Sequence, residues 1–151
     1  MQAGRLFTVI GLLVAMTGIS PATAQTVDDA AKFFDEVAAN GTTQIIPMES
    51  GRSYNPNLVF TPGRSATGSC SSRVSSTRQL ITIDWSGVIE ASAPNSAWIT
   101  IIGGVKLEAG DGSMMGLPGV FVPTNSAAMD VRLLKAIGII VKSCAKPSHG
   151  F

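Results

Sequence analysis

The first 24 residues limit what the rest of the chain folds into, because they have the pattern of a cleavable export signal. Arg5 gives the start a positive charge, an uncharged apolar run of 13 residues follows from Leu6 to Gly18, and the segment ends in Ala22-Thr23-Ala24. A charged region, an apolar region and a small-residue cleavage site in this order are typical of a secretory signal. The alternative, an uncut membrane anchor, needs about 20 apolar residues. We expect residues 1–24 to be removed, leaving a periplasmic or secreted protein that is not an integral membrane protein.

Removal of that signal leaves residues 25–151, enough for one small exported domain. The full chain has 11 Lys and Arg; Arg5 leaves with the signal, so 10 remain against 10 Asp and Glu. A near-neutral chain has no general electrostatic reason to bind nucleic acid or an anionic membrane. We therefore expect no nucleic-acid partner, while a local basic patch remains compatible with the composition.

Two cysteines, Cys70 and Cys144, belong to the mature chain. In an oxidising compartment an even pair favours a disulfide, and the alternative is two buried free thiols. Their spacing is unlike the Cys-x-x-Cys of redox motifs. We expect a Cys70–Cys144 bond that ties the end of a terminal helix to the segment before the first clear strand.

Two stretches have the periodicity of amphipathic helices. Residues 26–40 begin with Thr26 as a candidate cap and Asp29 three residues on. Asn40-Gly41 ends the stretch, either as a helix stop or as part of a glycosylation sequon. Residues 125–144 have apolar side chains at helical spacing, which predicts one buried stripe: Met129, Leu133, Ala136, Ile137, Ile140 and Cys144.

Strand patterns fill the region between the helices. In residues 79–85 the side chains of Ile81, Ile83 and Trp85 alternate with those at 80, 82 and 84, which point the other way, and this predicts that the three face the core. Further strands are predicted at 42–47, 98–102, 105–108 and 120–122, with Gly103-Gly104 as a bulge or a hairpin turn. Residues 88–91 either continue the first strand or begin another, 93–96 form a turn, and 109–118 form a Gly-rich loop.

Residues 49–77 have the composition of a loop-rich region, rich in Gly, Pro, Ser, Thr and Arg, with a strand pattern only at 58–60. Short connections between the strands favour antiparallel pairing. The predicted fold class is α+β, an antiparallel sheet or half-barrel with an N-terminal helix and a packed C-terminal helix.

Residues 70–145 carry a family resemblance. The order of features is a cysteine, then Ile81-Thr82-Ile83-Asp84-Trp85-Ser86-Gly87-Val88, then Phe121-Val122-Pro123-Thr124 leading into a closing helix with a late Cys144. This order resembles small exported bacterial proteins of unknown function with a pleckstrin-homology-like domain, a half-barrel closed by a C-terminal helix. The matching residues are core and cap positions, so the resemblance implies no catalytic site. The first hairpin lacks the clustered Lys and Arg with which lipid-binding members of the wider fold hold phosphates.

No motif in the chain predicts a catalytic residue, a metal or a cofactor. His149 is the only histidine and lies two residues from the end, where nothing holds an imidazole for catalysis. Residues 63–68 have the glycine spacing of a phosphate loop, but Ser69 stands where its lysine is required, so a flexible loop is the preferred interpretation. Glu108 and Asp111 supply too few oxygens for calcium.

The leading functional hypothesis is a non-enzymatic binding or interaction module for a partner protein or a small apolar ligand. The alternatives are a small envelope hydrolase using loop serine and carboxylate groups, and an accessory subunit of an envelope complex. Trp85 and Trp98 would suggest a binding surface if both were exposed on one face. Convergence of six side chains in one pocket would favour the hydrolase: Ser65, Ser69, Asp84, Glu108, Asp111 and Ser113.

Overall fold

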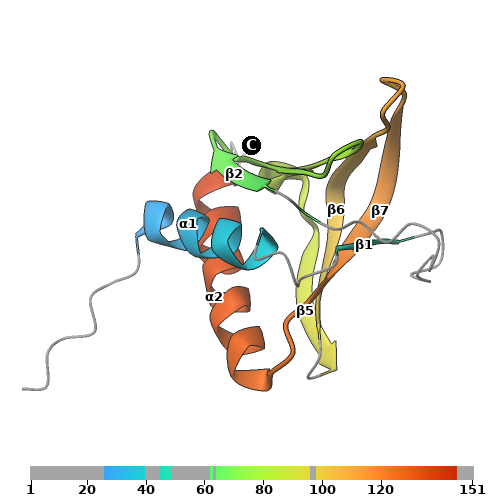
Figure 1. The fold of residues 1–151 in the computed structure, drawn as a ribbon. Helices are drawn as coiled ribbons and strands as arrows, with labels where there is room; N and C mark the ends of the chain where they lie inside the picture. Colours follow the sequence, from blue (N-terminus) through green and yellow to red (C-terminus); the bar gives the residue numbers. More distant parts are fainter. Residues whose placement is uncertain (1–25, 40–44, 49–61, 63, 96–97, 146–151) are drawn as a thin grey trace, which may run out of the picture.

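Two helices and an antiparallel sheet make up the described part of the chain, which comprises residues 26–39, 45–48, 62, 64–95 and 98–145 of a computed structural model. Figure 1 shows both helices on one side of the sheet. In chain order the elements are α1 (Val27–Ala38), β1 (Ile46–Pro47), β2 (Arg64–Gly68), β3 (Ser71–Ser75), β4 (Leu80–Asp84), the 3₁₀ turn η3 (Trp85–Gly87), β5 (Glu90–Asn95), β6 (Trp98–Glu108), β7 (Met114–Pro123) and α2 (Ala127–Cys144). The predicted α+β class is confirmed.

The sheet is open and antiparallel throughout, with the strand order β1-β7-β6-β4-β3-β2. The long strand β6 pairs with β5 through its first half and with β4 through its second half. Gly103 and Gly104 lie between the halves with φ of 84° and 67°, conformations that favour glycine. A Cβ at Gly104 would lie 2.3 Å from the Asp84 carbonyl oxygen. Gly103-Gly104 is therefore a bulge within β6 and not a hairpin turn.

The main core fills the space between the helices and the inner face of the sheet. Trp85 is fully buried and meets Phe34 of α1 edge-to-face, with ring centroids 4.9 Å apart. Ile81 and Ile83 point into the same cluster, as the alternation in residues 79–85 predicts. Five of the six residues in the predicted stripe of α2 are buried there, and Met129 packs at its margin: Leu133, Ala136, Ile137, Ile140 and Cys144.

Helix α1 begins as its sequence predicts. The Thr26 hydroxyl accepts a hydrogen bond from the Asp29 amide at 3.1 Å, and the Asp29 carboxylate accepts one from the Thr26 amide at 3.2 Å. These reciprocal bonds form a capping box, which satisfies backbone donors that the first helical turn leaves unpaired. The hydrogen bonds from the Thr26 hydroxyl and amide lower the pKa of the Asp29 carboxyl below its usual value.

A disulfide joins Cys70 and Cys144, with Cα atoms 5.4 Å apart, which confirms the predicted bond. Cys70 lies in the two-residue turn between β2 and β3, where Ser69 and Cys70 have φ of 44° and 63°. Two left-handed residues in a two-residue hairpin are typical of a type I′ turn, which usually takes Asn and Gly. The bond links this turn to the last residue of α2, and it is consistent with an oxidising compartment.

The loop prediction for residues 49–77 is wrong in its second half, which contains β2 and β3. These strands escaped detection because their inward positions include Ser65, Thr67 and Ser72, which interrupt the apolar alternation. Their hydroxyl groups form hydrogen bonds instead of apolar contacts. The predicted strand at 58–60 and the Asn40-Gly41 stop lie outside the described residues.

Two other boundaries differ from prediction. The predicted Gly-rich loop 109–118 is shorter, because β7 begins at Met114 and pairs with the second half of β6. The predicted turn at 93–96 is part of β5 as far as Asn95. Residues 88–91 do not continue β4, since η3 separates them from it and β5 begins at Glu90. In the segments 109–118 and 93–96, strand pairing overrides the local preference of glycine and proline for turns.

Candidate functional site

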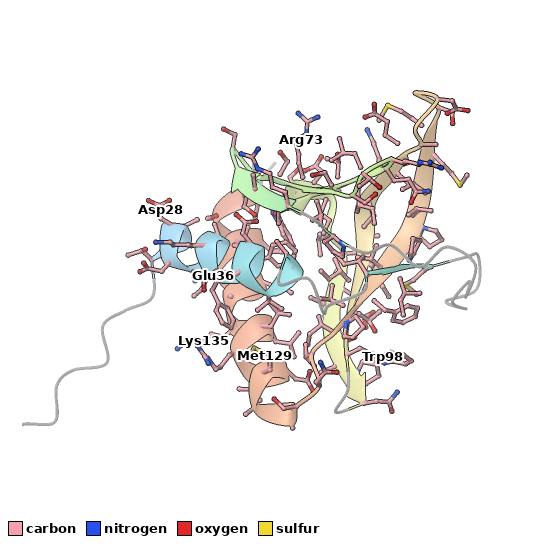
Figure 2. All side chains as sticks on the ribbon, viewed as in Figure 1. Asp28, Glu36, Arg73, Trp98, Met129 and Lys135 are labelled. Atoms are coloured by element: carbon pink, nitrogen blue, oxygen red, sulfur yellow. A yellow bond between two sulfur atoms is a disulfide. The ribbon has the colours of Figure 1, made fainter. Side chains whose placement is uncertain are left out.

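An open cleft of about 1000 Å³ lies over the outer face of the sheet, on the side opposite the helices. Figure 2 shows Arg73 on this side of the β2–β3 hairpin, pointing away from α1 and α2. Strands β2, β3 and β4 form its floor, and the loops after β3 and after β6 form one end. Among the described residues, the lining holds three arginines and one carboxylate, which gives it an excess of positive charge in a near-neutral chain: Arg64, Arg73, Arg78 and Glu108.

Strand register places the basic side chains in neighbouring rows. One row runs across the outer face as Ala66, Arg73, Thr82 and Lys106. The next row runs as Arg64, Ser75, Leu80 and Glu108. Directly paired residues lie on the same face of a sheet, so all eight side chains share the outer face. Within the described chain, the guanidinium groups of Arg64 and Arg73 form no ion pair or hydrogen bond.

The two hairpin ends meet at the cleft. In the β3–β4 connection, Ser76 Oγ accepts hydrogen bonds from the amides of Arg78 at 3.4 Å and Gln79 at 3.1 Å. Gly110, in the β6–β7 connection, lies against Arg78, since a Cβ built on it would be 2.9 Å from the Arg78 carbonyl oxygen. The close approach of the two connections holds Arg78 at the edge of the cleft.

A hydrogen-bonded relay beneath the cleft fixes β2 and β3 to the rest of the domain. The Trp85 indole nitrogen lies 2.8 Å from Ser72 Oγ, the hydroxyl oxygens of Ser72 and Thr67 are 2.5 Å apart, and Thr67 Oγ1 lies 2.7 Å from Asp35 Oδ1. An indole only donates and a carboxylate only accepts, so the direction is determined along the whole relay. Trp85 donates to Ser72, Ser72 to Thr67, and Thr67 to Asp35.

Asp35 also holds the edge strand directly. Its Oδ1 accepts from the Ser65 hydroxyl at 2.7 Å and its Oδ2 accepts from the Thr67 amide at 2.8 Å. An amide on an edge strand would otherwise be open to pairing with another chain. Helix α1 therefore covers part of the β2 edge and holds the strand that carries Arg64.

The six side chains whose convergence would favour a hydrolase lie in separate places. Ser65 is bonded to α1 on the inner side of β2, and Ser69 lies in the disulfide-bearing turn. Asp84 accepts from the amide and hydroxyl of Ser86 at η3, and Glu108 faces the cleft. The remaining two, Asp111 and Ser113, lie in the β6–β7 loop, where the hydrogen bonds from Ser113 lower the pKa of the Asp111 carboxyl.

The other residues singled out by sequence do not form a second polar site. Residues 64–68 of the glycine-spaced segment are strand β2, not the expected flexible loop. Trp85 and Trp98 lie in different clusters: Trp85 in the main core, and Trp98 against Phe121 with ring centroids 5.3 Å apart in a smaller cluster with Met48. His149 lies outside the described residues. The described ranges contain no group of three or more His, Cys, Asp or Glu side chains placed to hold a metal ion.

A smaller groove of about 290 Å³ lies between β5 and α2, and it is mainly apolar. Ile89 at its rim is 84% exposed, and Gly138 of α2 has open space where a Cβ would be. This groove is smaller than the cleft, and its described lining residues include no basic side chain. It therefore fits a different class of ligand from the cleft.

Comparison of the chain with protein-family models, with curated proteins and with solved structures gave no match. In the part of the chain that the structure describes, no helix is both long and apolar enough to span a bilayer. The expectation that the first hairpin lacks clustered Lys and Arg does not hold for β2–β3, which carries Arg64 and Arg73. Sequence reasoning missed these arginines because they become neighbours only through the pairing of β2 with β3.

Proposed function

We propose that this chain is a non-enzymatic exported binding module and that the cleft over β2, β3 and β4 is its binding surface. The observation that carries the proposal is the cleft itself, an open volume of about 1000 Å³ lined by guanidinium and hydroxyl groups. Binding sites are typically concave, with a few polar groups that fix the ligand. Sites on strands whose side chains are held by a supporting hydrogen-bond network are more precisely positioned than sites on loops.

Three matched tryptophan substitutions test which surface binds. Ala66→Trp fills the cleft from exposed β2 without changing charge, Gly138→Trp fills the groove beside α2, and Ala128→Trp adds the same bulk at an exposed position in the first turn of α2. Each protein is immobilised and used to capture material from an extract of its native envelope. We expect Ala66→Trp alone to lose the material that the unmodified protein retains. Equal capture by Ala66→Trp, or loss only with Gly138→Trp, would contradict the assignment of the cleft.

Export is part of the same proposal and has its own support. The apolar run and the Ala22-Thr23-Ala24 pattern predict signal cleavage, and a disulfide suits the oxidising compartment reached by export. Mass spectrometry of the protein from its native source should find Gln25 at the amino terminus. Recovery of the intact chain from membranes, with Met1 present, would contradict this part. The resemblance to exported pleckstrin-homology-like proteins is proposed with it, supported by the order of antiparallel strands and closing helix.

A further inference from the structure

We infer that the ligand of the cleft carries at least two oxyanion groups, phosphate or carboxylate, held by Arg73 together with Arg64 of the lining and with Lys106, which lies beyond the lining on the same face of the sheet. The inference rests on the proposed function and adds the chemistry of the ligand. Guanidinium groups match phosphate and carboxylate because their N–H donors bind two oxygens at once. Three guanidinium groups in the lining favour an oxyanion ligand, and none of them has a carboxylate partner within the described residues.

The strand register sets the spacing of the cationic groups. Arg64 and Arg73 are diagonal neighbours on paired strands, because Arg64 pairs with Ser75 and Arg73 lies two residues before it. Diagonal neighbours are about 7–8 Å apart at Cα. Arg73 and Lys106 lie in one row with only Thr82 of β4 between them, which is two strand spacings or about 10 Å. Because the three cationic side chains are spread over two rows of the sheet, a ligand with two or more linked oxyanions can contact more of them at once than a single phosphate or acetate can.

The uncharged neighbours leave Arg73 available to a ligand. Its direct neighbours in the row are Ala66 and Thr82, neither of which neutralises a guanidinium. The single carboxylate of the lining, Glu108, lies in the next row and is separated from Arg64 by Ser75 and Leu80. The lining is therefore positive on the β2–β3 side, whereas its loop end holds both Arg78 and Glu108, so an oxyanion ligand would lie with its charged groups over β2 and β3.

Isothermal titration with defined probes tests this chemistry. The multivalent probes are linear inorganic polyphosphate and polyglutamate, and the single-group controls are inorganic phosphate and acetate. We expect at least one multivalent probe to bind more than about tenfold tighter than its single-group control, because each charge-assisted contact adds affinity. Binding should weaken as salt is raised, since screening acts on exposed charges. The probe that binds distinguishes phosphate from carboxylate recognition.

A charge-matched pair of variants assigns the binding to the cleft. Arg73→Glu and Lys135→Glu change net charge equally, and both residues are exposed, but Lys135 lies on α2 far from Arg73 (Figure 2). We expect Arg73→Glu to weaken binding by more than about tenfold and Lys135→Glu to change it by less than about twofold. Circular dichroism and thermal unfolding check that both variants fold. Equal losses would show attraction to net charge and overturn the inference.

Failure of the inference is distinguishable from failure of the proposed function. If neither multivalent probe binds while Ala66→Trp still abolishes capture from the envelope extract, the cleft is a binding surface but its ligand is not an oxyanion. If a single phosphate or acetate binds as tightly as its polymer, the requirement for two groups is wrong. A further check is Glu108→Gln, which removes the only carboxylate among the described residues of the lining and should tighten the binding of the anionic probes.

Discussion

Replacing Ser72 by alanine tests the relay that supports the cleft. Ser72 is fully buried, and its oxygen accepts the N–H of Trp85, which is also fully buried. Without that oxygen the indole N–H loses its acceptor, and an unsatisfied buried donor costs about 1–3 kcal/mol. The substitution also removes the hydrogen bond from Ser72 to Thr67. Thr67 still donates to Asp35, so the loss of this second bond adds little. We therefore expect Ser72→Ala to lower the free energy of unfolding by about 1–3 kcal/mol.

The assay is urea unfolding of the disulfide-intact protein, followed by far-ultraviolet circular dichroism. Ser71→Ala is the matched control: the residue is adjacent, and its hydroxyl makes only a 3.4 Å contact with the Gly68 carbonyl. Its expected cost is below about 0.5 kcal/mol, the range of ordinary surface changes. The midpoint should fall without a change of slope, because the surface exposed on unfolding is nearly the same.

A double-mutant cycle with Trp85→Phe separates the hydrogen bond from other effects. Phenylalanine has no N–H, so Ser72→Ala in that background leaves no donor unsatisfied. We expect a coupling free energy of about 1 kcal/mol between the two sites. If Ser72→Ala costs the same in both backgrounds, the bond from Trp85 contributes nothing to stability and the reasoning about the relay is wrong.

Three further predictions concern the core, the disulfide and the capping box. Ile137→Ala should cost about 2–5 kcal/mol in urea unfolding, because Ile137 is fully buried, and a loss below about 0.5 kcal/mol would contradict its packing. Cys70→Ala with Cys144→Ala should cost about 4.5 kcal/mol on the chain-entropy model for a separation of 74 residues, whereas two titratable thiols in the denatured but unreduced protein would refute the bond. Thr26→Val should raise the lowered pKa of Asp29 toward 3.8 in an NMR titration. The Asp29 carboxylate stabilises the start of the helix above pH 3.8, and this contribution to stability is lost as pH falls below that value. An Asp29 pKa that Thr26→Val leaves unchanged would contradict the capping geometry.

The helices and the central strand were predictable because their apolar residues repeat at the period of the element. The stripe that contains Ile137 and Ile140 repeats at helical spacing, and Ile81 and Ile83 alternate as a strand requires. The disulfide was predictable from the expected compartment and the cysteine count, since the predicted export and an even number of cysteines together favour one bond.

The cleft was not predictable, because it depends on two strands without an apolar alternation. Their inward side chains include Thr67 and Ser72, and these are stabilised by Asp35 and Trp85, which lie far away in sequence. The local sequence pattern does not show which distant residues become the hydrogen-bond partners of these side chains.

The Cys70–Cys144 bond also decides how this domain would respond to being pulled from its ends. Tension applied at residues 26 and 145 passes from Cys70 to Cys144 through the sulfur atoms, so the chain between them carries no load. That closed loop contains β3 to β7 and α2, whereas α1, β1 and β2 lie outside it. At about 3.5 Å per residue, the disulfide prevents roughly 260 Å of extension of the 74-residue loop that it closes, until the bond is reduced. The strands that carry Arg73 and Lys106 are mechanically shielded, and the elements before Cys70 are the only ones that can extend.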